Sequence, residues 1–353
     1  MEEKQVKELD NIHCDFSAID GLEKEFNAIM SIRHDGKTTS FLMKKAWPAW
    51  RKGKATALLF RQVNDVNEYS IRYYLNLMKE FIDRPLNVEM RGIGGVGAVL
   101  LDKRPLFYCI PLGAKEATLK KTSFPDVAYE YFDEYEINPI NKEKYLPNEY
   151  GRFQTLHSTM LKLSPDIKFY MTSNPYSAYN PLFSGWGVKT SALRLGTMQK
   201  GKNWAVWFKR IHPDLLAKIR ESDPFFDEDS AYSRWAFSGS FANDRNSHVM
   251  PTMPGGYRLA IRFVFEGQRY SAFESTDYED EDRPLYYVKK GADDGKRRVT
   301  YAFDFADLVT NAVLATKDDR DRFHNLKRAM KGQDVAFDSI ETEEAFKMIY
   351  DYL

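Results

Sequence analysis

Short apolar runs alternate with amphipathic segments in the first part of the chain. Residues 26–30 are mostly apolar and predict a short buried strand, and residues 55–60 form a continuous apolar run, as expected for a strand buried on both faces of a parallel sheet. Between them, residues 38–47 have a helical pattern, and we expect Pro48 to end that helix. Residues 67–82 follow as an amphipathic helix. The order strand, helix, strand, helix predicts an α/β domain with a mainly parallel sheet.

The alternation continues to about residue 210. Further apolar runs predict strands at 106–112, 127–134, 167–172 and 203–209, and a helix is predicted at 145–163. The first 24 residues are polar and mixed. We interpret them as a partly ordered leader, the alternative being that Ile12, Phe16 and Ile19 approach the base of a nucleotide.

A glycine cluster at residues 92–97 matches G-x-G-x-x-G, the fingerprint of a dinucleotide site. Such a site requires a helix directly after the glycines. The chain instead continues with the apolar residues 98–101 and reaches Pro105 soon afterwards. We therefore predict a β-hairpin that joins 87–91 to 98–101.

The second half of the chain has a different pattern. Residues 222–256 are rich in Asp, Ser, Asn, Gly and Pro, which is typical of a linker. Alternating segments then predict an antiparallel meander at 257–265, 269–273 and 285–290, and helices are expected at 304–316, 319–330 and 342–353. We divide the chain into a first domain at 1–210, a linker region at 211–255 and a smaller α+β domain at 256–353.

Composition narrows the class of protein. The 353 residues include 51 basic and 51 acidic ones, so a wholly basic nucleic-acid coat is excluded, although a local basic face is not. Cys14 and Cys109 have no paired spacing, and we expect buried free thiols. No signal peptide is recognised and no apolar run approaches the length of about 20 residues that a membrane helix needs. We expect a reduced, cytoplasmic protein that does not contact a membrane.

The segment from Ser31 to Thr39 has the context of a phosphate-binding loop, because it follows a strand and opens a helix with Gly36-Lys37-Thr38. Lys37 would reach the β- and γ-phosphates of ATP, and the Thr38 hydroxyl would hold Mg2+. Two residues depart from the pattern. Ser31 stands where the first Gly is expected, and Asp35 adds a negative charge that Arg33, His34 or Mg2+ would have to offset.

A second motif lies at the end of the strand predicted at 127–134. Asp133 would bind Mg2+, and Glu134 would accept a proton from the attacking water. The alternative is an ordinary strand end with solvated acids. Glu130 is unexpected in this strand, because a buried strand should not carry an unpaired carboxylate.

A polar residue also follows the next predicted strand. Asn174 occupies the position of a γ-phosphate sensor in P-loop ATPases that have an additional central strand. The sequence Ser173-Asn174-Pro175 is equally typical of a simple turn.

Together these motifs, in this order and spacing, resemble the DNA-packaging ATPase of small short-tailed phages, the phi-29 group, over residues 25–183. The resemblance is carried by Arg33, Gly36-Lys37-Thr38, Arg61, Phe132-Asp133-Glu134, Pro147-Asn148-Glu149, Ser173-Asn174 and Asn180-Pro181-Leu182-Phe183. It implies a terminase-like P-loop ATPase of the additional-strand (ASCE) class. Such a protein forms a ring at a capsid vertex and drives double-stranded DNA into a prohead.

The resemblance also implies roles for individual residues, with ATP and Mg2+ as the bound groups. The nucleotide-binding residues would be Arg33, Gly36, Lys37, Thr38, Thr39 and Asn174; Thr38 and Asp133 would serve the metal, and Glu134 would be the catalytic base. Lys120 matches a basic residue supplied by a neighbouring subunit. The family's trans-acting arginine falls on Lys162, which lacks the bidentate fork of arginine, and Arg152 is a second candidate.

The implied partners are double-stranded DNA, further copies of the chain in a homo-oligomeric ring (pentameric in the family), the portal or connector, and a packaging RNA. The implied location is the host cytoplasm, transiently on the prohead. Two other classes of function stay open. One is a degenerate P-loop protein that binds nucleic acid without catalysis, and the other is a P-loop kinase acting on small molecules.

In the resembling family the C-terminal domain has an RNase H-like nuclease fold. Strand 257–265 carries no central Asp, and the acidic run 277–282 lies in a predicted loop, so we expect a vestigial nuclease domain. Basic residues of this domain are expected either to be solvated or to contact nucleic acid. They are Arg258, Arg262, Arg269, Lys289, Lys290, Lys296, Arg297 and Arg298.

Overall fold

The computed structural model divides the chain into two compact units. Unit 1 comprises Met1–Tyr176 and Leu193–Phe241, and unit 2 comprises Ser177–Ala192 and Ala242–Leu353. The residues that the structure describes are 13–92, 94–137, 144–175, 180–188, 193, 195–222, 249–277, 284–291, 299–303, 307–308, 311–331 and 334–349. Within these ranges no helix is both long and apolar enough to cross a membrane.

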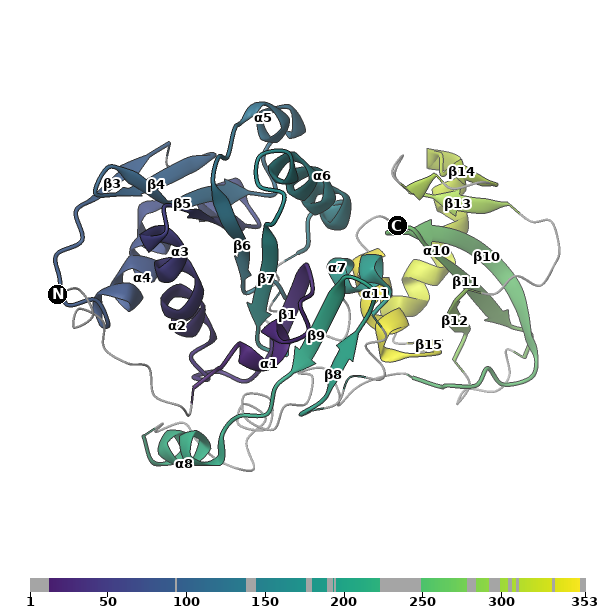
Figure 1. The fold of residues 1–353 in the computed structure, drawn as a ribbon. Coiled ribbons are helices and arrows are strands. Elements are labelled where there is room, and N and C mark those ends of the chain that lie inside the picture. Colours follow the sequence, from purple (N-terminus) through teal and green to yellow (C-terminus); the bar gives the residue numbers. More distant parts are fainter. Residues whose placement is uncertain are drawn as a thin grey trace. The chain divides into compact units, whose positions relative to one another are not determined.

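Unit 1 is built on a nine-stranded sheet with the order β3-β4-β5-β2-β6-β7-β1-β9-β8 (Figure 1). The six strands from β5 to β9 in this order are mutually parallel, and β3, β4 and β8 are antiparallel to their neighbours. The strands are β1 (Phe26–Met30), β2 (Ala55–Phe60), β3 (Val88–Arg91), β4 (Gly97–Leu101), β5 (Arg104–Pro111), β6 (Val127–Asp133), β7 (Lys168–Ser173), β8 (Met198–Lys200) and β9 (Trp204–Phe208). The predicted α/β fold with a mainly parallel sheet is confirmed.

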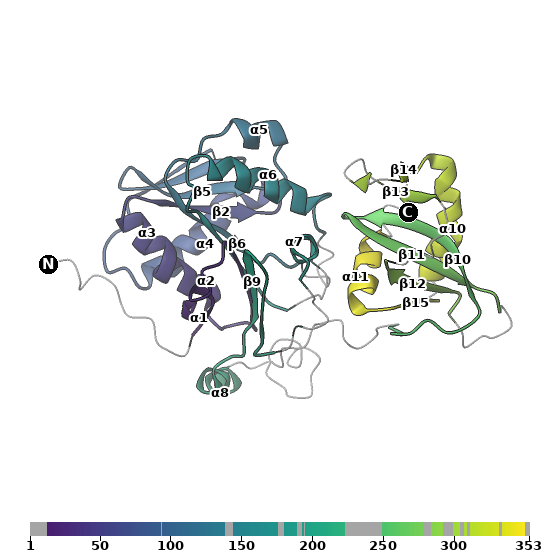
Figure 2. The same ribbon diagram turned by 45° about the vertical axis from the view of Figure 1, so that its right-hand side comes forward.

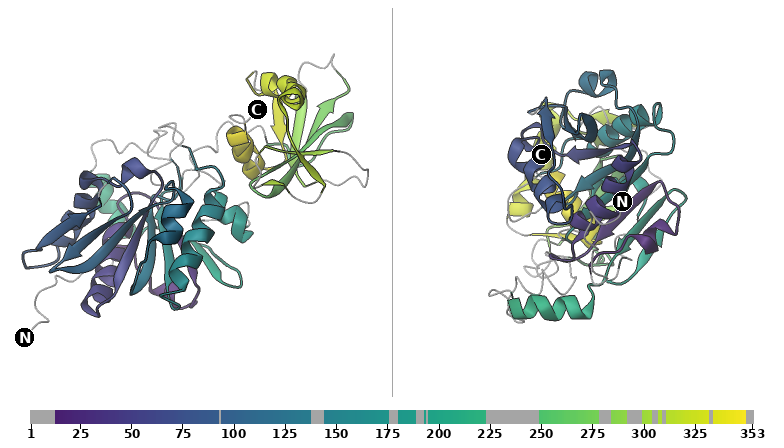
Figure 3. Two further views of the ribbon diagram at one scale, coloured as in Figure 1. Left: turned by 90° about the horizontal axis from the view of Figure 1, so that it is seen from above. Right: turned by 60° about the vertical axis from the view of Figure 1, so that its left-hand side comes forward.

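Helices cover both faces of this sheet (Figures 1 and 3). The helical segments of unit 1 are α1 (Ser17–Asp20), α2 (Lys37–Phe41), η2 (Leu42–Ala46), α3 (Trp47–Arg51), η3 (Val63–Asp65), α4 (Glu68–Lys79), α5 (Glu116–Lys121), α6 (Glu149–Leu161) and α8 (Pro213–Ser222). Segments α2 to α4 pack on one face of the sheet, where Tyr131 of β6 and Tyr170 of β7 belong to the same buried cluster as the helices. Helix α6 packs on the other, where Phe153 contacts Phe169, and α5 lies beside α6. Alternation of side chains along each strand separates the two faces.

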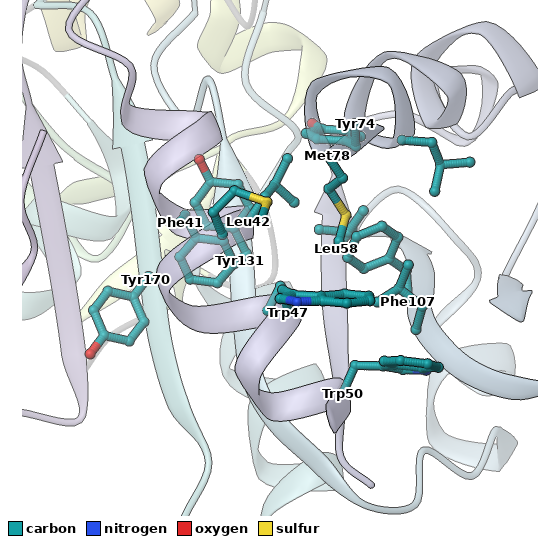
Figure 4. Packing of buried hydrophobic residues seen from close by; sticks show 14 of the residues in the cluster. Phe41, Leu42, Trp47, Trp50, Leu58, Tyr74, Met78, Phe107, Tyr131 and Tyr170 are labelled. Carbon is teal, nitrogen blue, oxygen red and sulfur yellow. The ribbon is translucent and has the colours of Figure 1, made fainter. Parts of the chain in front are cut away.

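Aromatic side chains fill the space between α2–α4 and the sheet (Figure 4). Phe41 stacks on Tyr131 with ring centroids 3.8 Å apart, and Trp47 stacks on Trp50 at 5.1 Å. The segment before β1 adds to this core, since Phe16 and Ile19 are buried in the same cluster. The part of the leader that contains Phe16 and Ile19 is therefore packed on the domain, and these two side chains are not available to a nucleotide base, whereas Ile12 lies outside the described residues.

The helix that follows the candidate phosphate loop does not end at Pro48. Segments α2, η2 and α3 are continuous, and η2 is a π-helical turn in which the N–H of Trp47 donates to the carbonyl of Leu42. Proline has no N–H, and in a regular helix its ring crowds the carbonyl four residues earlier. The wider turn just before Pro48 avoids that carbonyl, so the helix continues to Arg51.

The glycine cluster forms the predicted hairpin. Strands β3 and β4 pair antiparallel, with Arg91 opposite Ala98, and no helix follows β4. A Cβ atom on Gly97 would lie 2.7 Å from the carbonyl oxygen of Arg91, so the close backbone approach requires glycine there. The two cysteines are buried free thiols, as expected, and burial raises the pKa of each to about 12.

Unit 2 contains a six-stranded sheet with the order β14-β13-β10-β11-β12-β15 (Figure 2). Its elements are α7 (Pro181–Trp186), β10 (Tyr257–Phe265), β11 (Gln268–Ser275), β12 (Tyr286–Lys290), β13 (Thr300–Ala302), β14 (Ala312–Leu314), α10 (Lys317–Lys331), β15 (Val335–Phe337) and α11 (Ile340–Ile349). Strands β10, β11 and β12 form the predicted antiparallel meander. Phe263 packs against Phe323 of α10 and Phe346 of α11.

The helix predicted at 304–316 is wrong. Residues 312–314 instead form β14, which pairs in parallel with β13, and β13 in turn pairs in parallel with β10. This three-residue strand is defined by its pairing with β13 and not by a local pattern, because its apolar residues are equally compatible with a helix.

Candidate nucleotide site

Three parallel strands bring the predicted motifs to one edge of the unit 1 sheet. Strand β7 lies between β1 and β6, with Met30 opposite Ser173 and Asp133 opposite Thr172. Because carboxyl ends of parallel strands meet at the same edge, the loop after β1, the acids at the end of β6 and the residue after β7 converge. Strand β7 is the additional central strand that the sequence predicted.

The loop after β1 is compatible with Ser31. The Ser31 N–H donates to the carbonyl of Ser173 at 3.2 Å, and Ser31 does not adopt a positive φ. The left-handed positions are His34, with φ of 64°, and Gly36, with φ of 69°. A Cβ atom at Gly36 would also lie 2.8 Å from the His13 ring, so glycine is needed there. The loop therefore does not require glycine at residue 31.

Lys37 is the central cation of this site. Its side chain is buried, and Nζ donates to the carbonyls of Ser31 and Ile32, each at 2.9 Å, and to Oδ1 of Asn174 at 3.1 Å. Burial lowers the pKa of Lys37, while the charges of Asp35 and Glu134 act in the opposite direction. The residue therefore links the loop to the end of β7.

The acids lie opposite the loop. Asp133 Oδ2 accepts a hydrogen bond from the Thr38 hydroxyl at 2.8 Å, and Oδ1 accepts one from the Thr172 hydroxyl at 2.7 Å. Glu134 is exposed and has φ of 50°, a strained conformation for a residue other than glycine. Strain of this kind is characteristic of functional sites, where the surrounding structure maintains it.

A cavity of about 270 Å³ lies between these groups. It is lined by Arg33, His34, Gly36, Lys37, Thr38, Thr39, Tyr73, Glu134 and Asn174. The lining includes all the residues predicted to bind nucleotide and the predicted base. Tyr73 was not predicted, because its position on α4 carries no local sequence signal. Burial raises its pKa, as do the charges of Asp133 and Glu134.

The donors present fit a magnesium–nucleotide complex better than a resident metal. Within the described residues no group of three or more His, Cys, Asp or Glu side chains is placed to hold a metal ion. Thr38 and Asp133 instead offer adjacent oxygen atoms. Mg2+ is commonly held by one or two protein oxygens together with water and substrate phosphates.

Arg61 and Glu149 support the segment after Glu134. Arg61 Nε donates to Glu149 Oε2 at 3.0 Å, a second guanidinium nitrogen donates to the carbonyl of Tyr135, and the guanidinium lies 5.2 Å from the Phe132 ring centroid. Glu149 is fully buried. These residues carry part of the family resemblance, and their contacts indicate a structural role.

Glu130 has a partner that the sequence did not indicate. Its Oε2 lies 2.5 Å from His157 Nδ1, and His157 Nε2 lies 2.8 Å from Glu25 Oε1. Burial alone would lower the pKa of His157, but the hydrogen bonds and charges of Glu130 and Glu25 outweigh it and raise this pKa to about 9. A protonated histidine therefore neutralises the buried carboxylate.

The basic residues predicted to act between subunits do not line the cavity of their own chain. Lys162 caps the end of α6, next to Ser164, whose hydroxyl accepts from the N–H of Val127 at the start of β6. Since Asp133 ends the same strand, this is the opposite edge of the sheet, about 20 Å away. Lys120 is exposed and pairs with Glu116. Arg152 donates to the carbonyls of Leu112 and Ala114.

The basic residues of unit 2 do not form a single face. The cross-strand register places Arg262 and Lys289 on one side of the meander, both opposite Ser271. Lys290 lies opposite Tyr270 and is therefore on the other side, and Arg258 pairs with Glu274. Lys296, Arg297 and Arg298 lie outside the described residues. Contact of either side with nucleic acid stays a prediction.

Comparisons with known proteins agree with this geometry. No family model matches the chain. The chain is 22% identical over 255 residues to a DNA packaging protein of Bacillus phage B103, which covers 69% of the chain and 71% of that relative.

Two solved structures match almost the whole chain. One is the Phi-28 gp11 DNA packaging motor, with a TM-score of 0.60 and 17% identity; the match covers 97% of this chain and 98% of that one. The other is the bacteriophage Phi-29 viral genome packaging motor assembly, with a TM-score of 0.61 and 15% identity; the match covers 97% of this chain and 99% of that one. The chain shares the fold of these motor proteins across both units, and the resemblance predicted from the sequence is confirmed.

Proposed function

We propose that the chain is an ATP-driven motor that packages double-stranded viral DNA into a prohead, and that ATP is hydrolysed in the cavity described above. The observation that carries the proposal is the 2.8 Å hydrogen bond between Thr38 and Asp133, beside Lys37 at the carboxyl edge of the sheet. A threonine in the first turn of a helix, an aspartate at a strand end and a buried lysine, all at one edge of the sheet, form the arrangement that binds a nucleoside triphosphate with its metal. The fold shared with phage packaging motors supports this assignment.

Residues of the loop would bind the triphosphate. Lys37 would exchange its contacts with the carbonyls of Ser31 and Ile32 for the β- and γ-phosphates, which gain more from an ammonium group than neutral carbonyls do. Thr38 and Asp133 would hold Mg2+, which when bound neutralises phosphate charge. Asn174, already in contact with Lys37, would sense the γ-phosphate.

Hydrolysis would be an in-line displacement. A water oxygen forms a bond to the γ-phosphorus while the bond to the bridging oxygen of ADP breaks, and Glu134 accepts the proton that the water loses. The exposed position of Glu134 on the cavity wall supports this role. Lys37 stabilises the negative charge that develops on the transferred phosphoryl group.

We further propose that the chain acts as a homo-oligomeric ring, pentameric as in the resembling family, on a portal with a packaging RNA, in the host cytoplasm. Lys162 or Lys120 of one subunit would complete the site of the next, since neither lines the cavity of its own chain. Unit 2 would be a vestigial nuclease-like domain. Mixing Lys162→Ala subunits with Lys37→Ala subunits tests the shared site, because a complete site can then form only in a mixed ring, where Lys37 of one subunit meets Lys162 of the other. Turnover of the mixture no higher than that of either variant alone argues against it.

The function itself is tested by the ATPase rate of the wild type and of Lys37→Ala, each with and without double-stranded DNA. We expect DNA to stimulate the wild type and turnover to be abolished in the variant. Binding of ATP without turnover points to the degenerate P-loop protein, and turnover that ignores DNA but responds to small-molecule acceptors points to a kinase. Unchanged turnover in Lys37→Ala contradicts the proposed site altogether.

A further inference from the structure

The phosphate loop contains a buried acid whose charge is compensated from another strand. Asp35 is fully buried, and it is absent from the residues that line the cavity, so its carboxylate lies behind the loop. Its Oδ2 accepts a hydrogen bond from the Ser31 hydroxyl at 2.6 Å, and its Oδ1 accepts one from Lys209 Nζ at 2.7 Å. Lys209 is itself buried and directly follows β9.

Ser31, Asp35 and Lys209 explain how the loop accommodates its two departures from the phosphate-loop pattern. Ser31 replaces the glycine of the usual pattern, and Asp35 adds a negative charge to a loop that should receive phosphates. The Ser31–Asp35 hydrogen bond closes the loop across four residues. The sequence suggested that Arg33 or His34 would offset this acid, but its ion-pair partner is Lys209.

The charge of Asp35 also acts on the central lysine. Among the charged groups that influence Lys37, Asp35 has the largest effect. A carboxylate without Lys209 would attract the Lys37 ammonium away from the cavity and repel an incoming anion. Compensation of Asp35 by Lys209 leaves Lys37 free to bind phosphate.

A second contact keeps Lys209 in place. Ile32 of the loop is buried in an apolar cluster with Ile211, Leu215 and Ile219, which belong to the segment after Lys209 and to α8. Strand β9 also pairs directly with β1, with Phe208 opposite Met30. The loop and the chain after β9 are therefore joined by both an ion pair and an apolar contact.

We propose that Lys209 is a positioning residue for ATP binding: it neutralises Asp35 from behind the loop, so that the Ser31–Asp35 hydrogen bond holds the loop in its phosphate-binding conformation. This inference rests on the proposed ATP site. It assigns no contact between Lys209 and the nucleotide, since Lys209 does not line the cavity.

A double-mutant cycle tests the inference with Lys209→Met, Asp35→Asn and the double variant, in the full chain. ATP affinity is measured by titration, KM and kcat by steady-state turnover, and folding by thermal unfolding. We expect Lys209→Met to raise Kd and KM for ATP at least tenfold with a much smaller change in kcat. Asn at residue 35 can still accept from Ser31 but carries no charge, so the double variant should return to within about threefold of the wild type.

Arg210→Met is the matched control, because Arg210 is the exposed basic neighbour of Lys209 and should leave KM unchanged. A double variant that is folded but binds ATP as weakly as Lys209→Met overturns the inference, because the lysine then acts other than through Asp35. If Lys209→Met does not fold, the folded double variant alone decides the question. If the wild type does not bind ATP, the proposed function fails, and the cycle measured by thermal unfolding still shows whether the two residues are coupled.

Discussion

Two groups of ionisable side chains lie along strand β6, and they differ in what surrounds them. At the end of the strand, Glu134 lines the same cavity as Lys37, and Asp133 beside it accepts a hydrogen bond from Thr38. Three residues earlier, Glu130 points to the opposite face of the sheet, where His157 lies between Glu130 and Glu25 and contacts both carboxylates. Both groups combine carboxylates with a cation, but the first one borders the cavity described above, whereas in the second one His157 and Glu130 are buried against each other.

The difference separates binding from stability. Each ring nitrogen of His157 contacts a carboxylate, and the side chains of His157 and Glu130 are 6% and 0% exposed. The charges of this group therefore compensate one another inside the domain. Lys37 is also buried, but its partners include two backbone carbonyls, which a phosphate can replace at little loss. A change in the first group should therefore affect turnover, and a change in the second should affect folding.

The largest effect is expected from Glu134→Gln. The amide keeps the size of the side chain but cannot accept a proton from water, so ATP hydrolysis should slow by about 10²- to 10⁴-fold while ATP binding is retained. Steady-state turnover and ATP titration measure the two quantities. Glu80→Gln, an exposed change just after α4, is the matched control and should leave both unchanged. Hydrolysis within a few-fold of the wild type would show that Glu134 is not the base.

The strand-end group was largely predictable from the sequence. The runs that form β1, β6 and β7 are mostly apolar, as expected for central strands of a parallel sheet, and the loop that ends in Gly36-Lys37-Thr38 follows the first of them. Parallel strands bring their carboxyl ends to one edge, so Lys37, Asp133 and Asn174 converge once the fold class is known. Each of these signals is local in sequence.

The groups that were missed depend on contacts between distant segments. His157 lies 27 residues from Glu130 on another element, and Lys209 lies 174 residues from Asp35. Nothing in the local pattern indicates that β9 pairs with β1, which is what brings Lys209 to the loop. The helix through Pro48 was missed for another reason, since the π-helical turn that accommodates the proline is a local geometry without a sequence signature.

A smaller effect, on folding alone, is expected from His157→Leu. The variant leaves Glu130 buried without its cation, and the second oxygen of Glu130, Oε1, already lacks a hydrogen-bond partner. The free energy of unfolding should fall by about 3–5 kcal/mol, as for other broken buried pairs. Chemical denaturation measures it, with Ser158→Ala on the exposed side of α6 as a control that should change it by less than about 0.5 kcal/mol.

The double variant Glu130→Leu/His157→Leu sharpens this prediction. It removes both charges and should recover most of the lost stability, because no uncompensated carboxylate remains. A double variant as unstable as His157→Leu would show that lost packing, and not charge, dominates. ATP affinity of the folded protein should be unchanged throughout, and a large change in affinity would contradict the separation between the two groups.

The smallest effect is a pH dependence of the free energy of unfolding, which we expect from the group formed by His157, Glu130 and Glu25. The pKa of His157 is raised from 6.5 to about 9 in the folded protein, so between these values the native state binds more protons than the unfolded state. The contribution of His157 to stability is therefore fully present below pH 6.5 and is lost as the pH rises towards 9, a total on the order of 3 kcal/mol. Comparison with His157→Gln, which does not titrate, isolates this contribution from other groups. The difference in unfolding free energy between the two proteins should shrink across this range, and a difference independent of pH would mean that His157 is neutral in the folded protein and that Glu130 is compensated in another way.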